Sequence, residues 1–187
     1  MGGGSVNLQV TLLNRSSALE PKHGPMDKSR RLIFVLLLTL FTLGVDQASK
    51  VWATAQLANQ PPHTYLGVLT LTYSRNYGGW GSLGANWSPW ARSAFFLVLP
   101  SLFLLGLAVH TAANSKVNRW ELAGAAMLVA GGAGNLIDRA RFGFVQDFLY
   151  LGYGPIGTNI FNVADMAILA GIGLLLAGPY LKGKPQE

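Results

Sequence analysis

The residues of this chain that could do acid–base chemistry gather in one stretch, from Gly131 to Asp165. Polar side chains stand there between two long apolar runs, among them Asn135, Asp138, Arg139, Asp147, Asn162 and Asp165. Ionisable groups beside membrane-length apolar segments are costly to hold, and such groups usually serve a function. Two carboxylates held close together share a proton, so one can deprotonate a water while the other protonates a carbonyl oxygen or a leaving amine. Such a pair can hydrolyse an amide.

The sequence lacks most of the residues that other kinds of catalytic site or a metal site would need. There is no cysteine, which excludes thiol nucleophiles, disulfides and thiolate metal sites. The three histidines, at positions 23, 63 and 110, are far apart in the chain and none lies near the polar stretch. Neither a metal cluster nor a Ser–His–Asp arrangement is indicated, so we expect no metal and no cofactor.

The residues favour Asp147 and Asp165 as the acid–base pair. Asp138 is followed directly by Arg139, a pattern typical of a structural ion pair. Asp147 lies alone beyond the third apolar run, and we expect Asp165 to face it from the start of the fourth. The spacing leaves the alternative pair, Asp138 with Asp165, open.

The composition predicts a membrane protein. Only 12% of the residues are charged, whereas a soluble domain carries about a quarter. Four apolar runs, at 31–49, 91–113, 121–137 and 160–181, each approach the roughly 17–25 residues that a helix needs to cross a bilayer. We therefore predict an all-α integral membrane protein with four transmembrane helices in a single domain, 26–187. Residues 1–25 show no helical periodicity and are interpreted as a tail or a cloning remnant.

The basic residues predict the orientation of these helices. They precede the first run, separate the second from the third, and follow the fourth: Lys28, Arg30, Arg31, Lys116, Arg119, Lys182 and Lys184. An even number of spans places all of them on one side, the cytoplasm, together with both termini. The net charge of +6 is then explained by topology, and no nucleic-acid partner is needed.

Polar residues of separate segments should meet at one depth, near the outer surface. Asp46 lies about 20 Å along the first helix from Leu32 and shares a face with Lys50. The two can form an ion pair that helps Lys50 reach lipid headgroups, or they can brace a site or meet a headgroup. The third run is rich in Gly and Ala, which predicts close helix packing.

A segment between the first two spans has strand character. Residues 64–66 and 69–73 are rich in β-branched and aromatic side chains, and we expect a small sheet resting on the membrane surface. Trp87 and Trp90 are interpreted as interface anchors. Asn76 beside Gly78 could hold an extended peptide, because a polar side chain there adjoins a bare backbone.

Five short blocks of the sequence occur in an order that points to a family. They are Asp46-Gln-Ala-Ser-Lys50, Asn76-Tyr-Gly78, Gly134-Asn135-Leu-Ile-Asp138-Arg139, Val145-Gln-Asp147-Phe148 and Phe161-Asn162-Val-Ala164-Asp165. From Met26 to its C-terminal end the chain resembles the lipoprotein signal peptidases (signal peptidase II). Gly79-Trp80 and Gln146 depart from the family pattern, which affects the expected shape of the peptide channel rather than the chemistry.

The resemblance implies a bacterial inner-membrane aspartyl endopeptidase that acts near the outer leaflet. Its substrates would be prolipoproteins, cut on the N-terminal side of a cysteine that carries diacylglycerol, and membrane lipids would be its other partners. Asp147 and Asp165 would be catalytic and Asp138 and Ala164 supporting. The substrate-positioning residues would be Asp46, Lys50, Asn76, Gly78, Asn135, Arg139 and Asn162. The family fold adds an extracytoplasmic β-cradle, expected at about 56–90, and a short mobile helix, and we expect a monomer.

Two other classes of function compete with this interpretation. Intramembrane acids also mark proton and ion routes, but transporters place them near the midplane with internal repeats, and this chain shows neither. A scaffold that binds a lipidated partner without cutting it is the second alternative. Both predict that Asp165→Asn has little effect on processing of a lipid-modified precursor.

Overall fold

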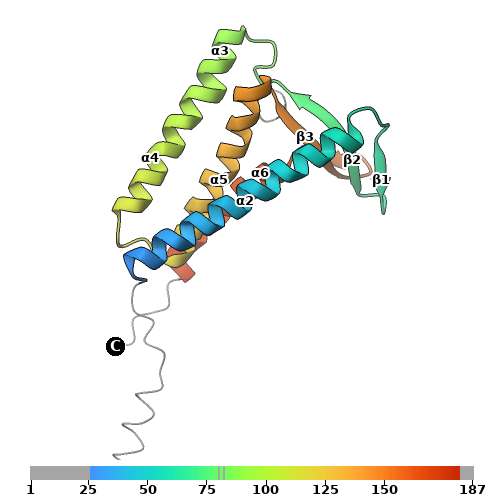
Figure 1. Ribbon diagram of the computed structural model, residues 1–187. Helices are drawn as coiled ribbons and strands as arrows, with labels where there is room; N and C mark the ends of the chain where they lie inside the picture. The colour runs from blue at the N-terminus through green and yellow to red at the C-terminus, as the bar shows by residue number, and fades with distance from the viewer. Residues whose placement is uncertain (1–25, 80, 82, 182–187) are drawn as a thin grey trace, which may run out of the picture.

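A computed structural model describes residues 26–79, 81 and 83–181 of the chain. The predicted tail at 1–25, Trp80, and the basic residues Lys182 and Lys184 lie outside the described residues. Long helices dominate the fold and a small sheet projects from one end of them (Figure 1). The helical segments are α2 (Lys28–Leu57), α3 (Pro89–Ser93) continued by the π-helical turn η2 (Ala94–Val98) and α4 (Leu99–Ala113), α5 (Arg119–Phe142) and α6 (Val163–Leu181).

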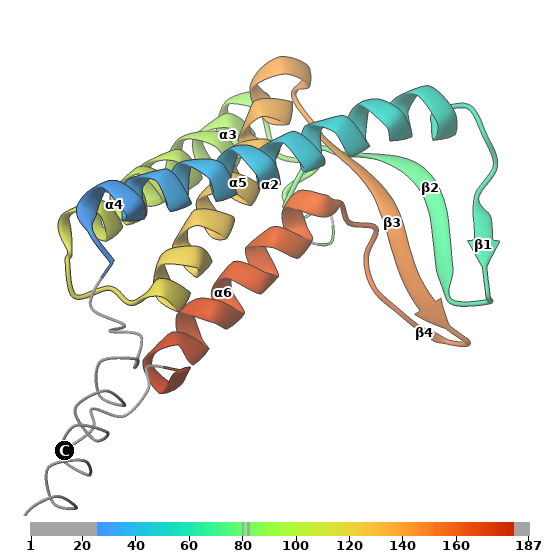
Figure 2. The ribbon, with the colours of Figure 1, turned by 60° about the horizontal axis from the view of Figure 1, so that its bottom comes forward.

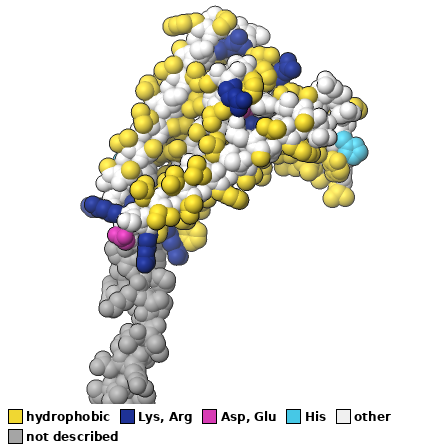
Figure 3. All heavy atoms as spheres, viewed as in Figure 1, with side chains coloured by type: hydrophobic (Ala, Val, Ile, Leu, Met, Phe, Trp, Pro, Cys, Tyr) yellow, Lys and Arg dark blue, Asp and Glu magenta, His cyan; other side chains and the backbone are white. Residues whose placement is uncertain are grey.

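Three of these segments are long and apolar enough to cross a membrane. They are α2, the continuous helix from Pro89 to Ala113, and α6. Large apolar side chains such as Phe41, Leu102 and Leu169 stand exposed on them, and apolar side chains are spread along the visible face of the helices (Figure 3). A surface of this kind marks contact with lipid. The chain is therefore a multi-pass membrane protein, and the predicted fourth span, formed by α5, stays a prediction.

Helix α5 is the centre of the bundle and packs most closely against α6. A Cβ atom built on Gly124 would lie 2.7 Å from the carbonyl oxygen of Gly171, so the two backbones are in contact. This confirms the close packing predicted from the small residues of the third run. Asn118 and Glu121 form a capping box at the start of α5, and Gly143, with φ 77°, ends it in a left-handed conformation. The local sequence thus sets both ends of the helix that carries Asn135 and Asp138.

The sheet is larger than predicted. Its four antiparallel strands are ordered β1 (His63–Tyr65), β2 (Leu69–Asn76), β3 (Val145–Tyr153) and β4 (Ile156–Gly157). The first two match the strand-like segments, but β3 and β4 lie beyond the region at 56–90 that was expected to form the cradle. Residues 145–148 are all buried, so β3 lacks the alternation that marks a half-exposed strand in sequence.

The strands and helices converge at one end of the bundle. Figure 2 shows β3 leaving the end of α5 and α6 starting beside the sheet, with the C-terminal part of α2 crossing the start of β3. Pairing of β2 with β3 places Ser74 opposite Asp147 and Asn76 opposite Val145. The fold therefore brings α2, α5, α6 and two strands to the place where the polar residues lie.

Candidate active site

Asp147 is fixed from three sides on strand β3. Its Oδ1 accepts a hydrogen bond from Asn162 Nδ2 at 2.7 Å, and its Oδ2 accepts one from Asn76 Nδ2 at 3.0 Å. The preceding residue, Gln146, donates its backbone N–H to Asp138 Oδ2 at 3.0 Å, which holds the start of the strand on α5. The Asp147 side chain is buried, and its carboxylate orientation follows from these donors.

Asp165 lies in the first turn of α6, where backbone N–H groups lack helical partners. Its Oδ2 accepts from the Asn162 backbone N–H at 3.1 Å, and its own N–H donates to Asn162 Oδ1 at 3.0 Å. Its Oδ1 accepts from Asn135 Nδ2 at 2.8 Å. Asp165 is half-buried, whereas Asp147 is almost fully buried, so the two carboxylates differ in access to solvent.

Asn162 links the two carboxylates directly. Its side-chain amide donates to Asp147, its backbone amide donates to Asp165, and its side-chain oxygen accepts from the Asp165 backbone. Burial, together with the negative charge of Asp165, raises the pKa of Asp147 from 3.8 to about 6. Two coupled carboxylates titrate as one unit and can retain a proton near neutral pH. The arrangement is therefore suited to general acid–base chemistry.

The alternative pair, Asp138 with Asp165, is not what the geometry favours. Asp138 is fully buried, and its Oδ2 contacts Lys50 Nζ at 3.1 Å as well as the Gln146 backbone. The predicted ion pair with the adjacent Arg139 is wrong: the cation that contacts Asp138 is Lys50, from another helix. Neighbours in a helix point away from each other, so the tertiary partner replaces the sequence neighbour.

Asp46 and Lys50 form the ion pair expected from their spacing, with Nζ 3.0 Å from Asp46 Oδ2. The side chains are 0% and 1% exposed, so the interpretation that Lys50 reaches lipid headgroups is wrong. Lys50 Nζ also donates to Asn135 Oδ1 at 3.1 Å, and Asp46 Oδ1 accepts from the Ala164 N–H at 2.9 Å. The pair therefore braces the site, because it ties α2 to α5 and to the first turn of α6.

The turn after β2 lies over Asp147. Asn76 Oδ1 accepts from the Gly78 N–H at 3.0 Å while its Nδ2 donates to Asp147. Arg139 Nη2 donates to the Gly78 carbonyl at 2.8 Å. Both backbone groups of Gly78 are thus engaged within the protein, and the predicted roles of Asn76, Gly78 and Arg139 in holding substrate stay predictions. All of the site residues expected from the sequence come together here.

Some supporting residues were missed by sequence reasoning. Gln47 Nε2 donates to Asp46 Oδ2 at 3.0 Å and reaches the Gly134 carbonyl at 3.3 Å. Gln146, noted only as a departure from a pattern, is buried, and its Oε1 accepts hydrogen bonds from Thr54 Oγ1 and, at 3.3 Å, from the Tyr73 hydroxyl. The signal available in the sequence was a polar residue in an apolar stretch, since such a group needs hydrogen-bond partners when it is buried.

Comparison with known proteins adds independent evidence. The family model described as signal peptidase (SPase) II matches residues 38–180. The chain belongs to the signal peptidase II family. It is 34% identical over 155 residues to the lipoprotein signal peptidase of Pseudoalteromonas translucida, a match that covers 81% of this chain and 91% of the relative. The corresponding protein of Desulforapulum autotrophicum is 37% identical over 145 residues, covering 77% and 90%.

Solved structures of bacterial membrane enzymes share the fold. A bacterial membrane enzyme determined by the in meso method at 1.9 Å resolution has a TM-score of 0.67 and 25% identity, covering 81% of this chain and 94% of that one. A second, at 2.3 Å, has a TM-score of 0.66 and 24% identity. Membership in the signal peptidase II family makes the chain a membrane protease, in agreement with its apolar helices.

Proposed function

We propose that this signal peptidase II homologue is an aspartyl endopeptidase in which Asp147 and Asp165 are the catalytic residues. The observation that carries the proposal is the position of Asn162, which donates to Asp147 Oδ1 at 2.7 Å and to Asp165 Oδ2 at 3.1 Å. One residue thereby orients both carboxylates. Among the acidic residues of the described chain, Asp46 and Asp138 are instead in contact with Lys50.

The reaction follows from the shared proton. The ionised member of the pair takes a proton from a water molecule, whose oxygen attacks the carbonyl carbon of the scissile amide. The protonated member gives its proton to the carbonyl oxygen, which produces a neutral gem-diol. The proton taken from water then passes to the leaving nitrogen while the first donor recovers a proton from one hydroxyl of the gem-diol, and the C–N bond breaks to give an acid and an amine. A pKa of about 6 for Asp147 supports retention of a proton near neutral pH. Asn76 and Asn162 keep the carboxylate oxygens in place throughout.

The substrates we propose are prolipoproteins carrying diacylglycerol, cut on the N-terminal side of the lipidated cysteine. The names of the relatives, lipoprotein signal peptidases, support this class of substrate. The exposed apolar side chains of the sheet and its first turn, Leu66, Tyr153 and Ile156, support a sheet that rests on a membrane surface, where such a lipid anchor is held. We further propose that Asn76, Gly78 and Arg139 position the peptide.

The membrane placement we propose has four spans, both termini in the cytoplasm and the site near the outer leaflet of a bacterial inner membrane. Arg31, at the start of α2, donates to the carbonyls of Asn114, Ser115 and Val117, in the loop between α4 and α5. The basic residues of both segments therefore share one end of the bundle, as the positive-inside rule requires. All residues named for the described site belong to one chain, which supports a monomer.

A gel-shift assay on a diacylglyceryl-modified prolipoprotein tests the proposal. Asp147→Asn and Asp165→Asn should each abolish cleavage, while Asp138→Asn should weaken it or destabilise the protein. Asp27→Asn, which removes an exposed carboxylate at the other end of α2, is the matched control and should cleave normally. Full activity of Asp147→Asn would show the pair to be wrong, and full activity of Asp165→Asn would favour a transporter or a scaffold.

A further inference from the structure

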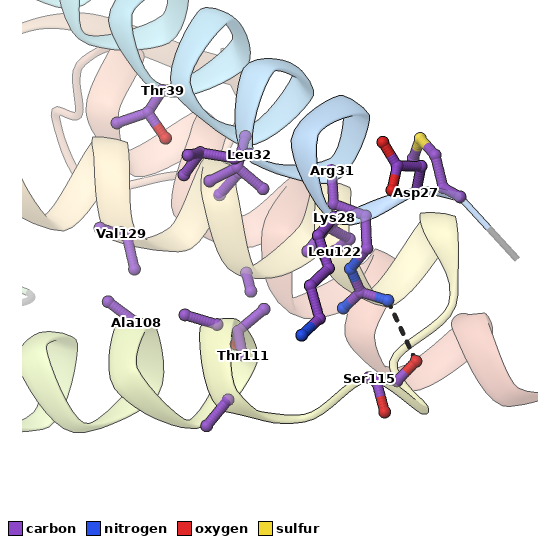
Figure 4. Close-up of a pocket in the computed structure, with 16 residues that line it drawn as sticks. Asp27, Lys28, Arg31, Leu32, Thr39, Ala108, Thr111, Ser115, Leu122 and Val129 are labelled. Carbon is purple, nitrogen blue, oxygen red and sulfur yellow. Dashed lines mark hydrogen bonds between the residues drawn. The ribbon is translucent and has the colours of Figure 1, made fainter.

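A cavity lies at the end of the bundle opposite the carboxylates. It has a volume of about 690 Å³ and is enclosed by α2, α4 and α5 (Figure 4). Its walls run from Lys28 and Arg31 at the mouth to Thr39, Ala108 and Val129 inside. Ligand sites in proteins have about this size, roughly 300–1,000 Å³. None of the residues proposed for cleavage lines it, so the peptidase chemistry leaves it without a role.

Small side chains keep the cavity open. Five alanines contribute to its walls: Ala108, Ala112, Ala113, Ala125 and Ala126. Protein interiors are normally close-packed, so an apolar space of this size at a lipid-facing surface calls for an apolar occupant. From Lys28 to Thr39 the axis of α2 rises by about 16 Å. That length matches one leaflet of a hydrocarbon core about 30 Å thick, and an acyl chain has the same reach.

The mouth of the cavity carries positive charge. Figure 4 shows the Lys28 amino group directed into the mouth, toward α4. Arg31 donates to three backbone carbonyls, at 2.9–3.2 Å, and these neutral acceptors leave its charge uncompensated. Asp27 is the acidic residue of the lining, against the cations Lys28 and Arg31. Basic pockets between transmembrane helices on the cytoplasmic side are suited to anionic lipid headgroups.

We propose that this cavity binds an anionic phospholipid, with an acyl chain between α2, α4 and α5 and the phosphate at Lys28 and Arg31. A signal peptide is the other candidate occupant that combines an apolar part with a polar end, and the positive charge of its polar end argues against it. The segment that precedes the apolar part of a signal peptide is positively charged and would be repelled by the same cations. The bound lipid would fill the space that the alanines leave and hold α2 against α4.

Native mass spectrometry of the full chain in detergent, titrated with phosphatidylglycerol or with phosphatidylcholine of the same acyl chains, tests this proposal. Phosphatidylglycerol should bind more tightly. Lys28→Gln should weaken its binding about fivefold, the equivalent of about 1 kcal/mol for one basic contact. Arg30→Gln is the matched control, since it removes an exposed cation of the same helix that does not line the cavity, and it should bind like the wild type.

A second pair of variants tests the apolar part. Ala108→Phe fills the cavity and should weaken both lipids at least fivefold, whereas Leu105→Phe, on the exposed side of α4, should weaken neither. Equal affinity for the two lipids, equal effects of Lys28→Gln and Arg30→Gln, or unchanged binding in Ala108→Phe would overturn the proposal. So would displacement of phosphatidylglycerol by an equimolar signal peptide with a basic N-terminal segment, which would make the cavity a peptide site.

Discussion

The stability of the site should depend most on the buried ammonium group of Lys50. Its Nζ lies 3.0 Å from Asp46 Oδ2 and 3.1 Å from Asp138 Oδ2. At an effective dielectric constant of about 20, two unit charges at this separation attract by about 5 kcal/mol. Desolvation of the three groups offsets much of this attraction, so the intact network adds little net stability. The cost appears when one partner is removed.

Lys50→Met removes the cation but keeps an apolar side chain of similar length. It leaves the buried carboxylates of Asp46 and Asp138 without a positively charged partner. Breaking a buried ion pair in this way costs about 3–5 kcal/mol. For a chain of this size the melting temperature should fall by roughly 6–20 °C. Thermal unfolding in detergent, followed by tryptophan fluorescence, measures the change, and the gel-shift assay should show cleavage reduced in parallel.

The exposed cation Lys116 provides the control for this prediction, and Lys116→Met should melt within about 1 °C of the wild type, because surface charges contribute little. The double variant Lys50→Met with Asp138→Asn should recover part of the loss, since one buried carboxylate fewer is left unpaired. A Lys50→Met protein that melts within about 2 °C of the wild type would refute this account of the network.

Three other predictions concern the Asp147 carboxyl, its donor Asn76 and the contact between α5 and α6. The folded protein holds the Asp147 proton more tightly than the unfolded chain, because the pKa rises from 3.8 to about 6. This stabilisation is complete below pH 3.8 and is lost as the pH rises through about 6, so the wild type should melt lower at pH 8 than at pH 5. Asp147→Asn should have a smaller pH dependence than the wild type, and equal slopes in both proteins would contradict the assignment. Asn76→Ala removes a donor to Asp147 and should lower the single-turnover cleavage rate by as much as about 100-fold, with a melting temperature within a few degrees of the wild type; an unchanged rate would mean that Asn76 does not orient the carboxylate. Gly124→Ala places a Cβ atom 2.7 Å from the Gly171 carbonyl and should cost about 1–3 kcal/mol, measured by thermal unfolding. Gly106→Ala meets no atom within 4 Å and should be neutral or slightly stabilising, so similar losses in both would argue against α5–α6 contact as the cause.

Much of the site was predictable because polar residues are conspicuous in apolar sequence. The spacing of Asp46 and Lys50 placed the two on one helix face, and the structure joins them through Asn135 to Asn162 and Asp165 in one hydrogen-bond network. Gln146, which departs from the family pattern, is buried and links β3 to α2 and β2 through hydrogen bonds from Thr54 and Tyr73. Its partners could not be predicted, since they lie on segments that only the fold brings near.

Strand β3 shows why other features escaped sequence reasoning. Its residues from Val145 to Phe148 are all buried, so they carry no period-two pattern of apolar and polar side chains. Their strand conformation depends on pairing with β2, and the helices from α3 to α5 separate the two strands in the chain. The cavity between α2, α4 and α5 is equally hidden, because alanines at helical spacing predict close packing as readily as open space.

The order of apolar runs, the caps of α5 and the acidic residues available for chemistry are properties of the sequence alone, since they depend on residue type and local spacing. Which carboxylate meets which partner was decided by the tertiary structure. Asp138 pairs with Lys50 of α2 and not with the adjacent Arg139, and Asn162 connects Asp147 to Asp165. Hydrogen bonds and ion pairs require contact at about 3 Å, and only the packing of helices and strands sets distances that short between remote residues.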